Sequence, residues 1–162
     1  MSTTTSMNSS GVDALNANSA GMVPSLISII KCSRVLIELR LADLGIRAGQ
    51  DHLLVALDPD GEPVLTSRLA DTIGVRASTA SKMLDRLEMR GFIRRGESLT
   101  DRRHTTVCLT EEGRIMRERI EAVWDDVERY IFHGQSDDVV SDVRRTTAQL
   151  ESILDERLRR LR

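Results

Sequence analysis

The side chains best suited to bind a polyanion lie in one short segment, residues 75–91. Its apolar residues recur at positions i, i+3, i+4 and i+7, which predicts an amphipathic helix that Gly91 ends. The opposite side carries short hydroxyls near the helix N-terminus and long cations one turn later. Backbone N–H groups at a helix N-terminus favour phosphate, and Arg and Lys bind phosphates or guanine edges. The residues expected to contact a nucleic acid duplex here are Arg76, Ser78, Thr79, Ser81, Lys82 and Arg86.

A second basic group follows, between two segments with strand patterns. Val107 and Leu109 alternate with Thr106 and Cys108, so "FIRRG" and "TTVCLT" predict two strands around a loop. A protruding basic tip can enter the minor groove of DNA, where the potential is most negative. The hairpin residues expected to contribute to binding are Arg95, Asp101, Arg102, Arg103 and His104.

The charge of the chain is unevenly distributed. The 162 residues carry a net charge of −2, yet residues 66–104 hold nine Lys/Arg against five Asp/Glu, a local net charge of +4. A basic middle in an acidic protein indicates an anionic polymer as partner, although charge alone is also typical of a solvated face. Aromatic residues make up only 2%, which disfavours a base-stacking platform for single-stranded nucleic acid.

The rest of the chain predicts helices that position these two groups. Residues 24–43 have an apolar stripe too wide for one small domain to cover, and residues 49–57 form a second, short helix. "DPDGEP" is a turn, and the next helix takes Thr66 as its N-cap and ends at Gly74. Thr110 caps a long helix that Gly134 ends, and Ser136 caps the last helix. The expected fold is mainly α with a small β-hairpin wing.

These motifs resemble the winged helix-turn-helix of the MarR family of transcriptional regulators. The resemblance rests on Leu69-Ala70, Ser78-Thr79, Asp85-Arg86-Leu87-Glu88, Gly91-Phe92-Ile93, Arg95, Asp101-Arg102-Arg103, Leu109-Thr110 and Gly113. "LGIRAGQDHLLVAL" also resembles the second helix of that family. The chain departs at Arg76, where the family often has a capping Ser or Thr.

Residues 1–22 are rich in Ser, Thr, Asn and Gly and can bury little apolar area, which predicts a disordered tail. For the rest of the chain, the resemblance implies that 23–48 is a dimerisation helix, 49–110 the winged helix-turn-helix, and 111–162 further dimerisation helices. The protein would be a homodimer that binds a pseudo-palindromic operator in double-stranded DNA, most simply as a repressor. Arg103 would probe the minor groove, oriented by Asp101.

The resemblance also implies a small-molecule effector, often an aromatic or phenolic acid, bound between the dimer helices and the winged domain. The residues expected to line its site are Cys32, Arg34 and His52. Cys32 could instead be a redox sensor, but its place inside the first helix favours a buried, small apolar residue.

Two other classes of function stay open at this point. One is a helical dimer that acts through protein contacts without DNA, which would have a neutral or acidic winged face. The other is an enzyme, although no nucleophile elbow, phosphate loop or zinc motif is present. His52, His104 and His133 lack metal-ligand spacing, and neither a metal nor another cofactor is expected. No segment is apolar for long enough to cross a membrane, and we expect a cytoplasmic protein.

Overall fold

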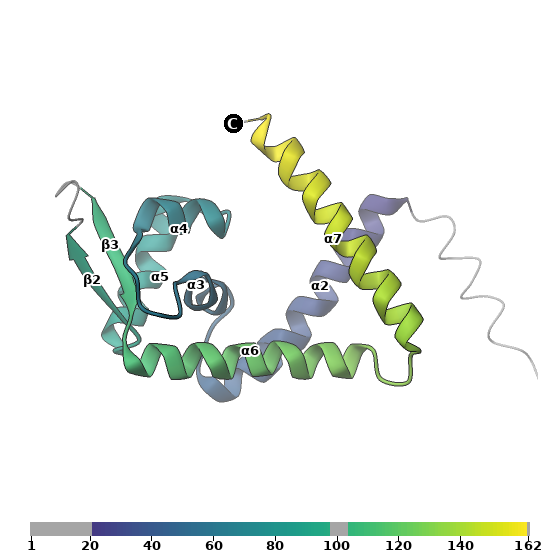
Figure 1. Cartoon of the computed structure of the whole chain (residues 1–162), viewed down its shortest axis with the longest axis horizontal. Coiled ribbons are helices and arrows are strands. Elements are labelled where there is room, and N and C mark those ends of the chain that lie inside the picture. The colour runs from purple at the N-terminus through teal and green to yellow at the C-terminus, as the bar shows by residue number, and fades with distance from the viewer. Residues whose placement is uncertain (1–20, 98–103, 162) are drawn as a thin grey trace, which may run out of the picture. The chain divides into compact units, whose positions relative to one another are not determined.

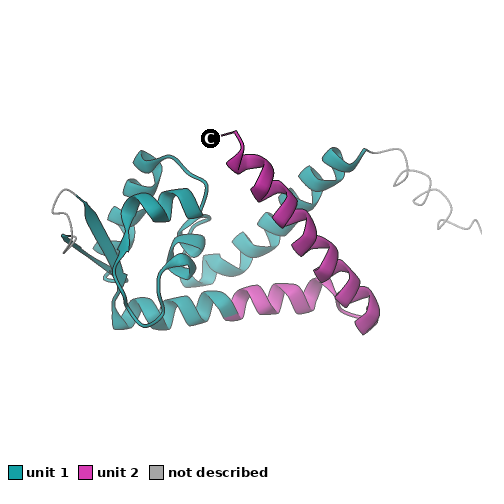
Figure 2. Cartoon of the chain, turned by 45° about the horizontal axis from the view of Figure 1, so that its top comes forward, with its two compact units in different colours: residues 1–121 teal, residues 122–162 magenta. Residues whose placement is uncertain are grey.

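The computed structural model describes residues 21–97 and 104–161. The chain divides into two compact units, residues 1–121 and residues 122–162 (Figure 2). The predicted wing-tip residues Asp101, Arg102 and Arg103 lie outside the described residues, as does nearly all of the predicted tail, residues 1–22.

The first unit contains the helix-turn-helix and the strands (Figure 1). Its helices are mostly short, and α3, α4 and α5 gather beside β2 and β3. The elements in chain order are α2 (Met22–Leu41), the 3-10 helix η1 (Ala42–Leu44), α3 (Gln50–Ala56), β1 (Val64–Leu65), α4 (Thr66–Thr72), α5 (Ala77–Met89), β2 (Ile93–Glu97), β3 (Thr105–Leu109) and the first part of α6 (Glu111–Ile131).

The sheet has three antiparallel strands in the order β1-β3-β2. Ile93 pairs with Leu109 and Glu97 with Thr105, which confirms the predicted hairpin. Strand β1 was not predicted, and it pairs Val64 with Val107 on the other side of β3. Two residues are too few to show the alternation from which a strand is recognised, and this is why the sequence pattern missed β1.

The core of this unit holds α5 in place from one side. Ala80, Leu84 and Leu87, all on α5, are completely buried. Leu53 and Leu54 on α3, Leu69 on α4, Val107 and Leu109 on β3 and Ile120 on α6 are also buried. Burying a Leu side chain contributes roughly 1.5–3 kcal/mol, so this packing fixes which side of α5 faces outward.

Both helices of the tight pair end as predicted, at glycines with positive φ. Gly74 has φ +68° and Gly91 has φ +76°. At the end of α5 the Gly91 N–H donates to Glu88 O and the Phe92 N–H donates to Leu87 O. These two hydrogen bonds form the Schellman motif, which favours a residue without a Cβ at the left-handed position.

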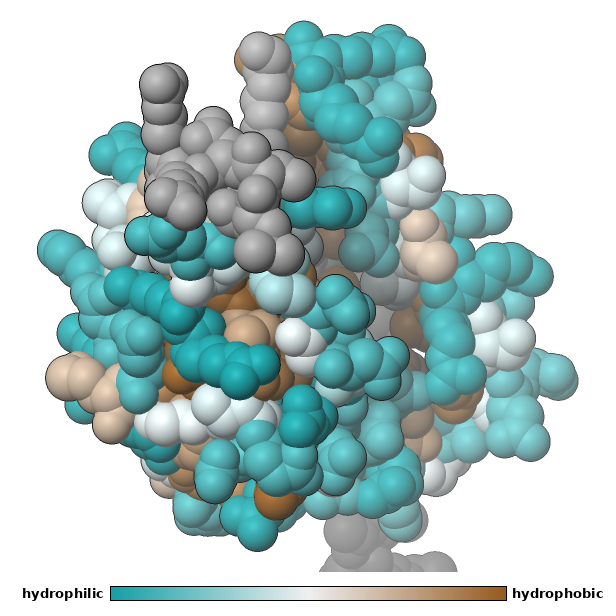
Figure 3. Space-filling model, turned by 60° about the vertical axis from the view of Figure 1, so that its left-hand side comes forward, coloured by the Kyte–Doolittle hydropathy of each residue, from teal (hydrophilic) through white to brown (hydrophobic). Residues whose placement is uncertain are grey.

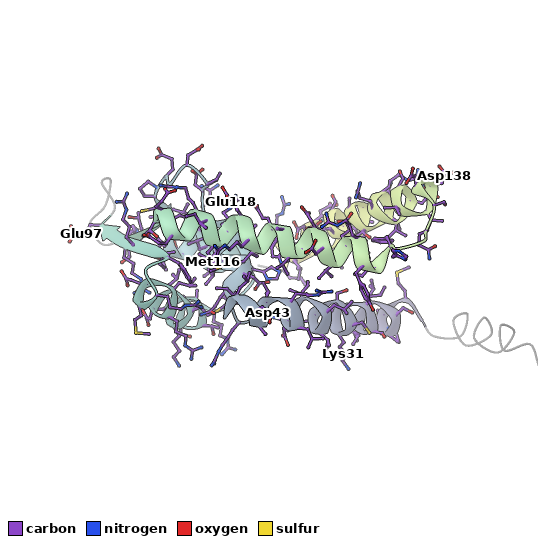
Figure 4. All side chains as sticks on the ribbon, turned by 90° about the horizontal axis from the view of Figure 1, so that it is seen from below. Lys31, Asp43, Glu97, Met116, Glu118 and Asp138 are labelled. Carbon is purple, nitrogen blue, oxygen red and sulfur yellow. The ribbon has the colours of Figure 1, made fainter. Side chains whose placement is uncertain are left out.

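Helix α6 begins where the structure brings its first turn against β2. The Gly113 N–H donates to Thr110 Oγ1 over 3.0 Å, which confirms the predicted cap, and the Thr110 hydroxyl donates to Gly91 O over 2.6 Å. A Cβ on Gly113 would lie 1.8 Å from Phe92 O. Met116 and Glu118 point to opposite sides of α6, and Met116 is buried (Figure 4).

One other predicted cap is wrong. Thr66 is the first residue of α4 instead of its cap, and its hydroxyl donates to Thr105 O over 2.9 Å. Ser136 is the N-cap residue of α7 (Asp137–Arg159), as predicted, although its side chain makes no capping hydrogen bond.

The second unit consists of the end of α6 and helix α7. Arg144 forms an ion pair with Glu128, and Gly134 ends α6 with φ +79°, as predicted. Helix α7 has no buried residue. Large apolar side chains on it are exposed, namely Val139, Val143, Ile153, Leu154 and Leu158. No described helix is long and apolar enough to cross a membrane.

Candidate nucleic-acid interface

The outer side of α5 carries the predicted contact residues. The side opposite Ala80, Leu84 and Leu87 presents hydroxyls and cations: Arg76, Ser78, Thr79, Lys82 and Arg86 are exposed, and Ser81 is half-buried. Hydrophilic side chains cover most of the wing side of the molecule, and hydrophobic residues show mainly between them (Figure 3). Helix α5 therefore offers a polar surface on a rigid support.

Arg76 settles where this helix begins. It is the N-cap residue, with φ −66° and ψ 144°, and its carbonyl accepts hydrogen bonds from the N–H groups of Thr79 and Ala80. Its side chain makes no capping hydrogen bond, as expected of a residue without a short side-chain acceptor. The helix starts at Ala77, and the cationic side chain of Arg76 stays exposed beside its first turn.

Arg95 is engaged by α5 itself. Its Nη2 lies 2.6 Å from Asp85 Oδ1 and donates to Ser81 O over 3.1 Å, and its Nε lies 3.5 Å from Glu88 Oε2. Only 26% of its side chain is exposed. The sequence pattern placed Arg95 among the contact residues, and in this structure its guanidinium holds strand β2 against helix α5.

A small polar cavity lies between α4, α5 and the base of the β2–β3 hairpin. Its volume is about 200 Å³, and it is lined by Thr66, Ser67, Ser81, Arg95, His104 and Thr105. Three predicted contact residues from separate elements, Ser81, Arg95 and His104, thus meet around one hollow. Beyond Glu97, which ends β2 (Figure 4), the predicted tip lies outside the described residues.

A larger cavity lies between α2 and the start of α3, within the first unit. It has a volume of about 280 Å³ and is lined by Ile29, Ile30, Ser33, Arg34, Ile37, Glu38, Ala48, Gly49, Asp51 and His52. Arg34 and His52, two of the predicted effector residues, are therefore brought together. Cys32, the third, does not line this cavity.

Cys32 is exposed, so the prediction that it is a buried apolar residue is wrong. The physical reason is that the described residues of the first unit leave much of α2 exposed, including Val23, Ile27, Ile29 and Ile30. Cys108 lies on strand β3, as predicted, and it is buried.

Asp51 is a buried carboxylate at the wall of the α2–α3 cavity that sequence reasoning missed. Its Oδ1 accepts a hydrogen bond from the Gly49 N–H over 2.7 Å and lies 3.2 Å from His52 Nδ1. Burial alone would raise the pKa of Asp51, but the hydrogen bonds and charge of His52 and the Gly49 N–H outweigh it and lower that pKa. The hydrogen bond to Asp51 raises the pKa of His52, against burial and the positive charge of Arg34. Asp51 therefore stabilises the protonated form of His52 in the cavity wall.

Comparison with known proteins identifies the domain. Residues 48–105 match the model of the MarR family. The chain contains a MarR-family domain. The matched segment runs from the residue pair before α3 to the first residue of β3, and it includes every predicted DNA-contact residue from Arg76 to His104.

Solved structures show the same fold around the MarR-family domain. The transcriptional regulator SlyA is 19% identical, with a TM-score of 0.76, over 88% of this chain and 100% of that chain. FabT of Streptococcus pneumoniae, solved in complex with DNA, is 22% identical, with a TM-score of 0.70, over 83% and 96%. CouR of Rhodococcus jostii RHA1, solved with p-coumaroyl-CoA, is 27% identical, with a TM-score of 0.67, over 80% and 91%.

The MarR-family domain also contains contacts that no sequence pattern predicted. Asp85 and Glu88 hold Arg95, and Arg90 reaches the chain before α3, 45 residues away. Contacts between residues so far apart in sequence leave no periodic signal. Among residues 21–97 and 104–161, no group of three His, Cys, Asp or Glu residues could hold a metal ion.

Proposed function

We propose that this chain is a sequence-specific regulator of transcription that binds double-stranded DNA. Helix α5 would enter the major groove, which is wide enough for one helix, and the wing would enter the adjacent minor groove. The observation that carries the proposal is the outer side of α5, where exposed hydroxyls and cations stand opposite three fully buried apolar residues. The fold shared with FabT, a protein solved on DNA, supports it.

We also propose that the protein is a homodimer, joined through α2 and the C-terminal helices. Val35 and Leu39 on α2, and Leu154 and Leu158 on α7, are examples of large exposed apolar side chains. Such surfaces on one chain favour association, because covering them removes apolar area from water. Two recognition helices would then be about 34 Å apart, one turn of DNA, and would bind a pseudo-palindromic operator.

The proposed control is release from DNA by a small effector, so that the protein acts as a repressor. The cavity between α2 and α3 combines isoleucines with Arg34 and His52, each of which faces a carboxylate, Glu38 and Asp51 respectively. This lining suits a ligand with an apolar body and one anionic group that competes with those carboxylates. The fold shared with CouR, a protein solved with a phenolic acyl-CoA, supports this part.

A mobility-shift titration across a salt series tests the DNA-binding proposal. Duplexes would first be selected from a random pool with the purified full-length protein. If the bound protein neutralises about 6–10 phosphates, raising the salt concentration from about 50 to about 200 mM should lower its affinity for DNA by about 10³–10⁵-fold. No selected duplex, or an affinity indifferent to salt, would contradict the proposal and favour a protein that acts through protein contacts alone.

A further inference from the structure

The segment of residues 45–49 joins η1 to α3 and forms part of the wall of the α2–α3 cavity. Ala48 and Gly49 line that cavity directly. Its backbone is tightly held, because the Gln50 N–H donates to Arg47 O and the Arg47 N–H donates to Gln50 Oε1, each over 3.0 Å. A segment restrained in this way moves as a piece and does not yield one residue at a time.

The same segment is held by the far end of the recognition helix. Arg90, the C-cap residue of α5, donates from Nη1 to Gly45 O over 2.6 Å and from Nη2 to Leu44 O over 3.3 Å. The Arg90 guanidinium carbon also lies 4.7 Å from the centre of the Phe92 ring, and Phe92 is buried. A planar fork on two successive carbonyls, supported by an aromatic ring, holds both position and orientation.

A second contact lies about two turns further back on α5. Gly49 has φ +88°, and a Cβ at this residue would lie 2.5 Å from Met83 Cε. The Met83 side chain therefore fills the space that any larger residue at position 49 would need. Helix α5 thus meets residues 45–49 at both ends of the segment, through Arg90 at Gly45 and through Met83 at Gly49.

We propose that Arg90 is a positioning residue that couples the α2–α3 cavity to the recognition helix through residues 45–49. The inference rests on the proposed function, because it concerns how the cavity alters DNA binding. A molecule in the cavity presses on Ala48 and Gly49, and packed segments respond by shifting as units because they compress little. The Arg90 fork then carries that shift to the C-terminal end of α5 and changes how its outer side meets the groove.

Hydrogen exchange of the free protein tests the physical tie. Arg90→Gln removes the fork, and we expect amides in residues 44–50 to exchange at least about fivefold faster than in the wild type. Arg68→Gln is the matched control, because Arg68 is an exposed arginine on α4 in the same domain. In the Arg68→Gln variant, the exchange rates of the amides in residues 44–50 should stay within about twofold of the wild-type rates. Unchanged exchange in Arg90→Gln would overturn the proposal.

A double-mutant cycle on DNA affinity tests the coupling without needing to know the ligand. Ser33 lines the cavity from α2, away from residues 45–49, and Ser33→Phe places a ring in the cavity, with Ser33→Ala as the control that leaves it open. We expect Ser33→Phe to change the affinity for a selected duplex at least about fivefold, but less than about twofold in the Arg90→Gln background. The Arg68→Gln background should keep the full effect of the ring.

Equal effects of Ser33→Phe in the wild-type and Arg90→Gln backgrounds would overturn the coupling, as would no effect in either. Thermal unfolding of each variant shows that the compared proteins are folded. A wild-type protein that selects no duplex would overturn the proposed function instead. The two failures are distinguishable, because the exchange result does not depend on DNA.

Discussion

Arg95 Nη2 lies 2.6 Å from Asp85 Oδ1, and this contact joins strand β2 to the outer side of helix α5. The same guanidinium also reaches Ser81 O and Glu88, so one side chain from the wing meets three successive turns of the recognition helix. The orientation of the wing relative to α5 therefore depends on Arg95.

We expect a double-mutant cycle with Arg95→Ala and Asp85→Ala to give a coupling free energy of about 1 kcal/mol, since Arg95 is partly buried. Urea unfolding of the wild type, the two single variants and the double variant measures it. The pair Arg145–Asp142 on α7, with both side chains about two-thirds exposed, is the control and should give a coupling near zero. Equal couplings for the two pairs would show that Arg95 does not fasten the wing.

Replacing Gly113 should destabilise the first unit strongly. The Cβ of Gly113→Ala would collide with Phe92 O, a backbone atom that cannot swing away, and we expect a loss of about 2–4 kcal/mol in the free energy of unfolding. Gly96→Ala is the matched control, because its Cβ would meet Thr106 Oγ1 at 3.5 Å, an ordinary contact. Urea unfolding that ranks the two variants equally would contradict this account.

Removing the Thr110 hydroxyl should weaken the start of α6. Thr110→Val keeps the shape of the side chain but loses the bonds to the Gly113 N–H and to Gly91 O, at a cost of about 1–2 kcal/mol. Thr72→Val serves as the comparison, since the Thr72 hydroxyl bonds only within its own exposed helix turn. If Thr110→Val had the same midpoint temperature of thermal unfolding as the wild type, the cap would contribute nothing to stability.

The His52–Asp51 contact should make stability depend on pH. The pKa of His52 is raised in the folded protein, so its contribution is fully present below the ordinary value of about 6.5 and disappears as the pH rises through the folded pKa. We expect the stability difference between the wild type and His52→Asn to be larger at pH 5.5 than at pH 8.5. In an Asp51→Asn background this pH dependence should disappear or change sign, because the remaining causes, burial and the charge of Arg34, lower the pKa of His52. A difference that grows with pH would reverse the assignment.

Arg103→Ala should weaken DNA binding with little change in folding. Arg103 lies outside the described residues, and its role as the minor-groove probe is a prediction from the sequence and the family resemblance. Losing one groove contact should cost about 1–3 kcal/mol in binding, or roughly 5–150-fold in affinity. Arg119→Ala, an exposed arginine on α6, controls for net charge. Normal affinity of Arg103→Ala for a selected duplex would remove the wing from the proposed interface.

The recognition helix was predictable because its signals are local. Ala80, Leu84 and Leu87 repeat at helical spacing, Gly91 permits the left-handed end, and both features lie within 12 residues. The hairpin was predictable for a similar reason, since Val107 and Leu109 alternate with less apolar neighbours. A helix or strand can be predicted from the sequence where the segment is longer than one repeat of its apolar pattern.

The errors fall where a partner distant in sequence decides the outcome. The Thr66 hydroxyl bonds Thr105 O, 39 residues away, instead of capping its own helix. The ion pairs of Arg95 with Asp85 and Glu88 were also not predicted, because they depend on how the fold places β2 beside α5. Cys32 was predicted to be buried because it lies inside the first helix, but an apolar helix is buried only where another surface covers it.

Strand β2 is an edge strand of the sheet, with β3 as its neighbour on one side. The unpaired backbone N–H and C=O groups of an edge strand can pair with a strand of another molecule, which is a common route to fibrils. Here Arg94, Arg95 and Glu97 place charge along the strand. A second copy that approached this border would have to desolvate those charges, so the wing should resist fibril formation even in concentrated samples of the protein.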